Sequence, residues 1–103
     1  MGRWDEALEF LPTYEDVLIA AKYFDEWTEI QSLLIRQGLV PNDRDIRQKF
    51  HILAHKLQAR EASRKAFQIL ERLIVLCVDS QEKYRAEIVL GQMNELLLSL
   101  IHI

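Results

Sequence analysis

The sequence predicts an all-α protein, a bundle of four to five helices, and three observations lead to this prediction. Apolar residues recur at intervals of three and four along most of the chain, which is the spacing of one face of an α-helix. Only three Gly and two Pro occur in 103 residues, whereas an all-β fold needs a turn roughly every 8 to 12 residues. No segment of useful length alternates between apolar and polar residues, as a half-buried strand would.

Length and composition predict one domain. A chain of 103 residues can form one hydrophobic core but is too short for two. Half of the residues are apolar and 28% are charged, which is a globular rather than a disordered composition. We expect a single α-helical domain over residues 1–97.

A proline separates the first two expected helices. Residues 3–11 place Trp4 and Leu8 on one face of a short helix, which Pro12 interrupts. Thr13 and Asp16 have the spacing of a capping box and predict a second helix over residues 13–37. Its expected core stripe consists of Val17, Ala21, Phe24, Trp27, Ile30 and Leu34.

Gly38 has the character of a helix C′ residue, and Pro41 follows it, so a loop is expected at residues 38–42. Asn42 or Asp43 then caps a third helix over residues 43–59. The core stripe expected for this helix consists of Ile46, Phe50, Leu53 and Leu57.

A fourth helix is expected over residues 61–78, and its start depends on a change of phase. Five residues separate Leu57 from Ala62, which turns the stripe by more than a quarter of a turn. This change favours a break near Arg60, although no Gly or Pro marks it, and one continuous helix is the alternative. The stripe expected for the fourth helix consists of Ala62, Ala66, Ile69, Leu73 and Leu76.

Asp79 and Glu82 form a further cap signal and predict a fifth helix over residues 80–98. Its expected core stripe consists of Tyr84, Ile88, Met93 and Leu97.

The chain closes with LLLSLIHI, eight residues without a charge. Residues 98–103 resemble the translation of the transposase mosaic-end adapter used in shotgun sequencing libraries. The resemblance implies that this tail is adapter-derived, that Leu97 lies near the last natural residue, and that the domain is truncated at its C-terminus. The natural end of an amphipathic helix is the alternative.

The sequence predicts a cytoplasmic protein. Its N-terminus, MGRWDEALEF, is acidic and lacks the apolar core of a signal peptide. Cys77 is the only cysteine, which fits a reducing compartment. The longest apolar run, LIVLCV, is far shorter than the roughly 20 residues of a membrane helix, so no membrane association is expected.

Charge is distributed unevenly along the chain. Residues 1–35 contain two basic and eight acidic residues, a net −6, whereas residues 36–103 contain eleven basic and eight acidic residues, a net +3. A basic stretch lies at residues 47–65 and consists of Arg47, Lys49, Lys56, Arg60, Arg64 and Lys65. Either the acidic and basic parts complement each other within the bundle, or the basic stretch binds nucleic acid or an acidic partner.

Arg44 and His51 lie two helical turns apart on one face of the third helix. Their R-D-x5-H pattern resembles the Arg-x4-6-His motif of HEPN-type ribonucleases, which are all-α and act as dimers. The resemblance implies that Arg44 stabilises phosphate charge and that His51 serves in acid–base chemistry. The alternative is that both are ordinary surface residues, and no other catalytic residue is expected.

His51 and His55 have a spacing that can hold two zinc ligands, but no motif supplies a third ligand. We therefore expect no metal, no cofactor and no small-molecule ligand.

These observations together predict a non-enzymatic protein–protein interaction module, either complete or the N-terminal segment of a longer protein. A truncated bundle would expose the apolar face of the fifth helix, and that face would need a partner or the missing residues. A protein partner or self-association is therefore expected. A nucleic-acid-associated domain that uses the basic stretch is the alternative, and an HEPN-like ribonuclease is the third hypothesis.

Overall fold

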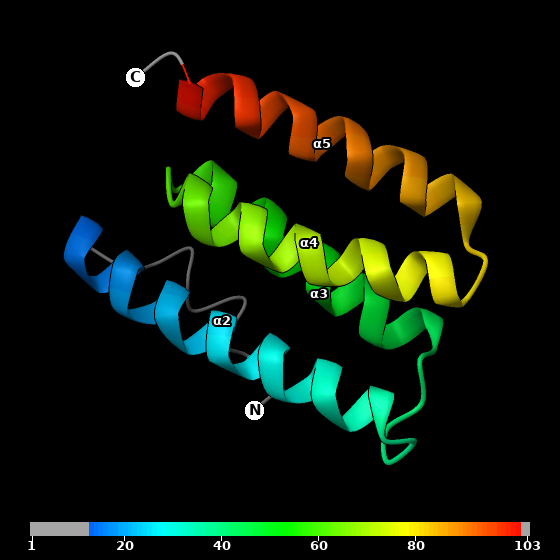
Figure 1. The fold of residues 1–103 in the computed structure, drawn as a ribbon. Coiled ribbons are helices and arrows are strands. Elements are labelled where there is room, and N and C mark those ends of the chain that lie inside the picture. Colours follow the sequence, from blue (N-terminus) through cyan, green and yellow to red (C-terminus); the bar gives the residue numbers. More distant parts are fainter. Residues whose placement is uncertain (1–12, 102–103) are drawn as a thin grey trace.

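A computed structural model describes residues 13–101, and every regular element in that range is an α-helix. The elements are α2 (Tyr14–Arg36), α3 (Arg44–Ala59), α4 (Ser63–Asp79) and α5 (Lys83–Ile101), and consecutive helices run antiparallel (Figure 1). The predicted all-α bundle is therefore confirmed.

Helix α4 lies at the centre of the bundle. It packs against α2, α3 and α5, whereas α2 and α3 touch each other only slightly. In Figure 1, α2 and α5 lie at opposite ends of the array, and α3 lies behind α4. None of the helices between residues 13 and 101 is long and apolar enough to cross a membrane.

The predicted helix boundaries agree with the structure to within about three residues. Helices α2, α3 and α4 correspond to the segments expected at 13–37, 43–59 and 61–78, and the loop expected at 38–42 is present. Helix α5 begins three residues later than expected and continues to Ile101. The helix expected at 3–11 lies outside the described residues.

Side chains cap the first two described helices at their N-termini. The Thr13 hydroxyl accepts a hydrogen bond from the Asp16 backbone N–H at 3.1 Å. The Asp43 carboxylate accepts one from the Ile46 backbone N–H at 3.0 Å, so Asp43 rather than Asn42 is the cap of α3. Asn42 instead donates its side-chain amide to the Leu76 carbonyl at 3.0 Å and ties the loop to α4.

Three helices end in the same backbone turn, a Schellman motif. Its C′ residue has a positive φ, which is 76° at Gly38, 65° at Glu61 and 62° at Gln81. The next backbone N–H then bonds a carbonyl five residues back, at 2.9 Å in each of the pairs Leu39–Leu34, Ala62–Leu57 and Glu82–Cys77. The break expected near Arg60 is confirmed, and a continuous helix over 43–78 is wrong. No glycine marked this break because Glu61 itself adopts the left-handed conformation.

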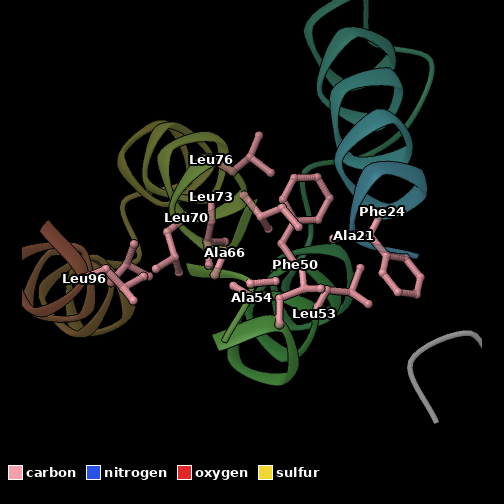
Figure 2. Packing of buried hydrophobic residues seen from close by; sticks show 14 of the residues in the cluster. Ala21, Phe24, Phe50, Leu53, Ala54, Ala66, Leu70, Leu73, Leu76 and Leu96 are labelled. Atoms are coloured by element: carbon pink, nitrogen blue, oxygen red, sulfur yellow. The ribbon is translucent and has the colours of Figure 1, made fainter. Parts of the chain in front are cut away.

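The hydrophobic core receives side chains from all four helices (Figure 2). The expected stripes of α3 and α4 are confirmed, with Ile46 partly buried and the other members buried. The largest fully buried side chains of these two helices are Phe50, Leu57, Ile69, Leu70 and Leu73.

The stripe expected for α2 is wrong at Ile30, which is 55% exposed, while Thr28 is fully buried. Each three-residue step from Phe24 to Trp27 and then to Ile30 falls 60° short of a full turn, so the predicted stripe rotates away from α4. Thr28 is tolerated in the core because its hydroxyl donates a hydrogen bond to the Asp25 carbonyl at 2.9 Å.

The stripe expected for α5 is also wrong. Tyr84 is 78% exposed, Ile88 and Leu97 are exposed, and the buried residues are instead Val89 and Leu96. Only Met93 of the expected stripe packs against the core. Helix α5 carries apolar residues on most of its sides, so their spacing alone does not identify the buried face.

A glycine at the α4–α5 turn tests the backbone conformation described here. A residue with a Cβ is destabilised by roughly 1–2 kcal/mol in the left-handed region. Replacement by glycine removes this cost, but glycine has greater freedom in the unfolded chain, which offsets part of the gain in stability. Gln81→Gly should therefore raise the free energy of unfolding by about 0.5–1 kcal/mol in urea denaturation.

The matched control is Glu87→Gly, at an exposed position in the second turn of α5. There the same residue type should lower the free energy of unfolding by about 1 kcal/mol. Equal destabilisation by the two substitutions would show that Gln81 does not adopt a left-handed conformation.

Candidate helix-docking surface

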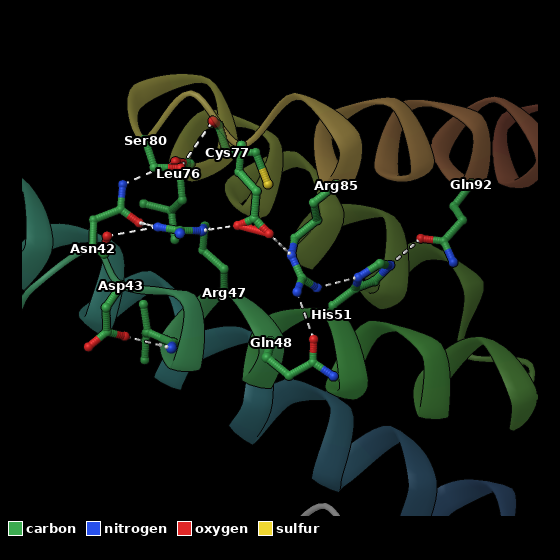
Figure 3. Close-up of polar contacts among 12 residues, drawn as sticks. Asn42, Asp43, Arg47, Gln48, His51, Leu76, Cys77, Ser80, Arg85 and Gln92 are labelled. Carbon is green, nitrogen blue, oxygen red and sulfur yellow. Dashed lines mark hydrogen bonds and ion pairs between the residues drawn. The ribbon is translucent and has the colours of Figure 1, made fainter.

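A chain of polar side chains joins α3 to α5 (Figure 3). Arg47 of α3 donates from Nε to Glu82 Oε2 at 2.6 Å, and from Nη1 to the backbone and side-chain oxygens of Asn42 at 2.7 Å. Arg85 of α5 donates from Nε to the other Glu82 oxygen at 2.6 Å. The Glu82 carboxylate thus lies between two guanidinium groups, which compensates the cost of removing these charges from water.

Arg85 also bonds two residues of α3 directly. Its Nη2 donates to Gln48 Oε1 at 2.8 Å, and its Nη1 lies 2.9 Å from His51 Nδ1. A guanidinium can only donate, so Nδ1 must accept, and the His51 ring is neutral with its hydrogen on Nε2. Nε2 then donates to Gln92 Oε1 at 2.7 Å. Both ring nitrogens of His51 are therefore bound by α5.

The surroundings of His51 favour its neutral form. Burial lowers the pKa of His51 below 6.5, and the charges of Arg85 and His55 lower it further, against the opposing effects of the Gln92 hydrogen bond and the Glu82 charge. The surroundings of Glu82 instead favour its charged form. Burial alone would raise the pKa of Glu82, but the hydrogen bonds from Arg85 and Arg47 hold it below its usual value of 4.5.

The two residues of the HEPN-like motif lie in different settings. Arg44 is exposed at the first residue of α3, whereas His51 is half-buried against α5. The acid–base role implied for His51 would require its ring to leave Arg85 and Gln92. Between residues 13 and 101, no group of three or more potential His, Cys, Asp or Glu ligands could hold a metal ion.

The residues of the basic stretch differ in their exposure and in their partners. Arg47 is only 8% exposed and faces α5, whereas Lys65 bonds Asp25 of α2 at 3.2 Å. Lys49 and Arg64 are exposed, and Lys56 and Arg60 are partly exposed with further interactions of their own. Arg47 and Lys65 therefore do not join one exposed basic surface.

Asp25 is the point at which acidic α2 meets basic α4. It is bonded by Lys65 and, more closely, by the Arg72 guanidinium, which also donates to Thr28 Oγ1 at 3.1 Å. Burial raises the pKa of Asp25, but these two cations outweigh burial and lower it below 3.8. The acidic and basic parts of the chain thus complement each other here.

On α5, a stripe of apolar residues follows the steps of four and three that are typical of a helix–helix seam. Its members, which we call the α5 seam, are Ala86, Leu90, Met93, Leu97 and Ile101. Ala86 and Met93 pack against the core at the inner edge of the seam. Leu90 is 55% exposed, Ile101 is 67% exposed, and Leu97 is also exposed.

Helix α4 continues this apolar surface. Phe67 and Ile74 pack at the edge of the core, and Val78 follows one turn later and is exposed. These residues lie beside Leu70, which points towards Leu96 of α5 in Figure 2.

The α4 residues and the α5 seam lie along the α4–α5 contact on the side away from α3, because Arg85 and Gln92 face α3 from the other flank of α5. We call the surface formed by Phe67, Ile74, Val78 and the α5 seam the docking groove.

Sequence reasoning named Met93 and Leu97 but assigned Leu97 to the core, and it did not name Leu90 or Ile101. A signal for the correct face was present in the two polar residues Arg85 and Gln92. They lie seven residues apart on one face of an otherwise apolar helix and mark the side that bonds α3.

Comparisons of the chain with protein-family models, with curated proteins and with solved structures found no match.

The His51 contacts predict a loss of stability in mild acid. The pKa of His51 is lower in the folded protein than the ordinary 6.5 of an unfolded chain, so the unfolded chain binds more protons as the pH falls. The contribution of His51 is complete above pH 6.5 and is lost as the pH falls below it towards the folded pKa. Asp25 and Glu82 titrate at lower pH because their pKa values are lowered.

Urea denaturation between about pH 8 and about pH 5 measures this effect. His51→Gln retains an acceptor and a donor but cannot titrate, so its free energy of unfolding should change much less over this range. His55→Gln, on the exposed side of α3, should keep most of the pH dependence of the unmodified chain, because burial of His51 is the larger cause of its lowered pKa. A drop in stability that persists in His51→Gln would show that the Arg85–His51 contact is not its source.

Proposed function

We propose that this protein is a non-enzymatic protein–protein interaction module whose docking groove binds an amphipathic helix. The observation that carries the proposal is the α5 seam, in which Leu90 and Leu97 are exposed although they share one helical face with Ala86 and Met93. An exposed apolar stripe of this kind marks an interaction site more often than a solvated surface.

The spacing of the apolar residues in the α5 seam suits helix-in-groove recognition. In that mode, apolar anchors at intervals of three, four and seven residues enter a groove between two helices. The α5 seam extends for about 22 Å along the helix axis, enough for four turns of a partner helix. Leu90 and Leu97 lie near its middle, where a partner would exclude water most completely.

The chain already makes a contact of this kind within its own fold. Helix α4 lies against both α2 and α3 and buries Ala66, Ile69, Leu73 and Leu76 in doing so. A partner helix lying against α4 and α5 would make an equivalent three-helix contact on the next pair of helices along the chain.

We also include a cytoplasmic location in the proposal. Cys77 is a free thiol buried in the core, and burial raises the pKa of this thiol, so it stays protonated and unreactive. A chain whose only cysteine is buried and unpaired is suited to a reducing compartment.

The proposal is tested by selecting helical peptides that bind the protein from a displayed library of amphipathic helices, and then measuring their affinity for two variants. Leu90→Glu places a charge in the middle of the groove and should weaken binding at least tenfold, or about 1.4 kcal/mol. The measurement is a fluorescence-anisotropy titration, and circular dichroism confirms that each variant is folded.

Ile88→Glu is the matched control, because Ile88 is also an exposed apolar residue of α5 but lies outside the seam. It should leave the affinity within about twofold of the unmodified protein. The proposal is wrong if no helix is selected, or if the selected helices bind Leu90→Glu as tightly as Ile88→Glu.

A further inference from the structure

Helix α5 is held by fewer buried side chains than α3 or α4. It buries Val89 and Leu96, whereas α3 buries five residues and α4 buries six. In Figure 2, Leu96 lies beside Leu70 at one end of the core, and Phe24 of α2 lies at the other end. Separation of α5 would therefore uncover one end of the core and leave the packing of α2, α3 and α4 in place.

His51 of α3 bonds α5 through both nitrogens of its ring (Figure 3). Nδ1 accepts a hydrogen bond from Arg85 Nη1 at 2.9 Å, and Nε2 donates one to Gln92 Oε1 at 2.7 Å. Nδ1 can accept only while the ring is neutral, because a protonated imidazole carries a hydrogen on each nitrogen. Protonation therefore replaces the Arg85–His51 hydrogen bond with a close contact between two positive charges.

The Arg85 side chain is itself held in place. Its Nε donates to Glu82 at 2.6 Å, its Nη2 donates to Gln48 at 2.8 Å, and the side chain is only 14% exposed. Rotation of the guanidinium into solvent would break both of these bonds. Movement of α5 away from α3 breaks the bond to Gln48 but keeps the bond to Glu82, which directly precedes α5. We therefore expect the repulsion to act on the attachment of α5 and not on the Arg85 rotamer alone.

The charged and titratable groups that influence the His51 ring come from α3 and from the start of α5. They are Arg85, His55 and Glu82. Glu82 favours the protonated ring, but Arg47 and Arg85 already share its carboxylate. On α4, the Cys77 thiol beside this network is uncharged, and Lys65 and Arg72 bond α2 instead. The carboxylate that could offset the repulsion from Arg85 is thus already neutralised.

Mild acid should loosen α5 and spare α2. Burial raises the pKa of Asp25, but Arg72 and Lys65 outweigh burial and keep this pKa below 3.8, so the α2–α4 contact stays charged at about pH 5. The pKa of Glu82 is likewise below its usual 4.5. His51 has an ordinary pKa of 6.5, so it is the member of these two contacts that gains a proton in mild acid once α5 separates.

We propose that protonation of His51 releases α5 from α3 and α4, and that helix binding by the docking groove weakens in mild acid as a result. Helices α2, α3 and α4 stay packed together in the released state. The groove is formed by α4 and α5, so a chain with α5 released retains only one of its two walls. This inference rests on the proposed function and adds the regulation of the same surface.

Hydrogen exchange of backbone amides, followed by NMR at about pH 7.5 and about pH 5, tests the release of α5. After correction for intrinsic exchange rates, the amides around Val89 of α5 should exchange faster than those around Ile69 of α4 at both pH values. The opening constant of α5 should rise by up to about thirtyfold at the lower pH, because the released His51 ring has an ordinary pKa of 6.5.

His51→Gln removes the titrating group, because glutamine keeps a donor and an acceptor but cannot gain a proton. The opening constant of α5 in this variant should stay nearly the same at the two pH values. His55→Gln is the matched control on the exposed side of α3 and should retain most of the pH dependence. Circular dichroism confirms that both variants keep their helical content.

The affinity for a helix selected on the docking groove tests the regulation. Fluorescence-anisotropy titration should give an affinity at least threefold weaker at about pH 5 than at about pH 7.5 for the unmodified chain. His51→Gln should lose much less of its affinity for the same helix. The comparison of the two proteins cancels any titration of the helix itself.

Four results would overturn the inference. At about pH 5 the amides of α5 could exchange as slowly as those of α4, their corrected exchange could be independent of pH, His51→Gln could show the acid dependence of the unmodified chain, or the helix affinity could be equal at both pH values. A failure to select any helix would instead contradict the proposed function, and the exchange measurements would still decide whether His51 releases α5.

Discussion

Arg85 donates hydrogen bonds from α5 to His51 and Gln48 of α3, and this contact fixes how α5 is rotated about its own axis. Helix α5 carries apolar residues on most of its sides, so hydrophobic burial alone distinguishes its faces poorly. The Arg85 guanidinium and the Gln92 amide distinguish the faces well, because each needs hydrogen-bond partners and an unpaired buried polar group is costly. Once Arg85 and Gln92 face α3, Val89 and Leu96 turn towards α4, and Leu90 and Leu97 turn outwards. The exposed groove is thus a consequence of the polar network on the other flank.

The network also links the two halves of the chain. Arg47 reaches Glu82 across 35 residues of sequence, and Asn42 reaches the Leu76 carbonyl across 34. The Asn42 contact attaches the α2–α3 loop to the end of α4, and the Arg47 contact attaches the start of α3 to the turn between α4 and α5. Because Glu82 bonds both Arg47 and Arg85, and Arg85 bonds Gln48 and His51 as well, the network specifies one arrangement of the helices more than it adds to their stability. Its sensitivity to mild acid follows from His51, whose neutral ring is required as an acceptor.

The sequence predicted local structure better than it predicted the site, for physical reasons that differ between helices. In α3 and the first half of α4, polar residues separate the apolar ones, so the stripes through Phe50 and Ile69 could be identified from spacing. The change of phase after Leu57 revealed the α3–α4 break although Glu61 is not a glycine. In α5 the stripe through Tyr84 was wrong because the partners of Arg85 and Gln92 lie more than 30 residues away, on α3. The site depends on that long-range contact, so local periodicity could not locate it.

Helix α5 buries Val89 and exposes Leu90, its neighbour in sequence. Thiol labelling of Val89→Cys and Leu90→Cys variants, at concentrations where the protein is monomeric, tests this claim most directly, with the unmodified chain as the control for buried Cys77. The Leu90→Cys thiol should react as fast as an exposed thiol, and the Val89→Cys thiol should react far more slowly. Equal rates at the two positions, or faster labelling at position 89, would show that α5 is rotated differently about its axis.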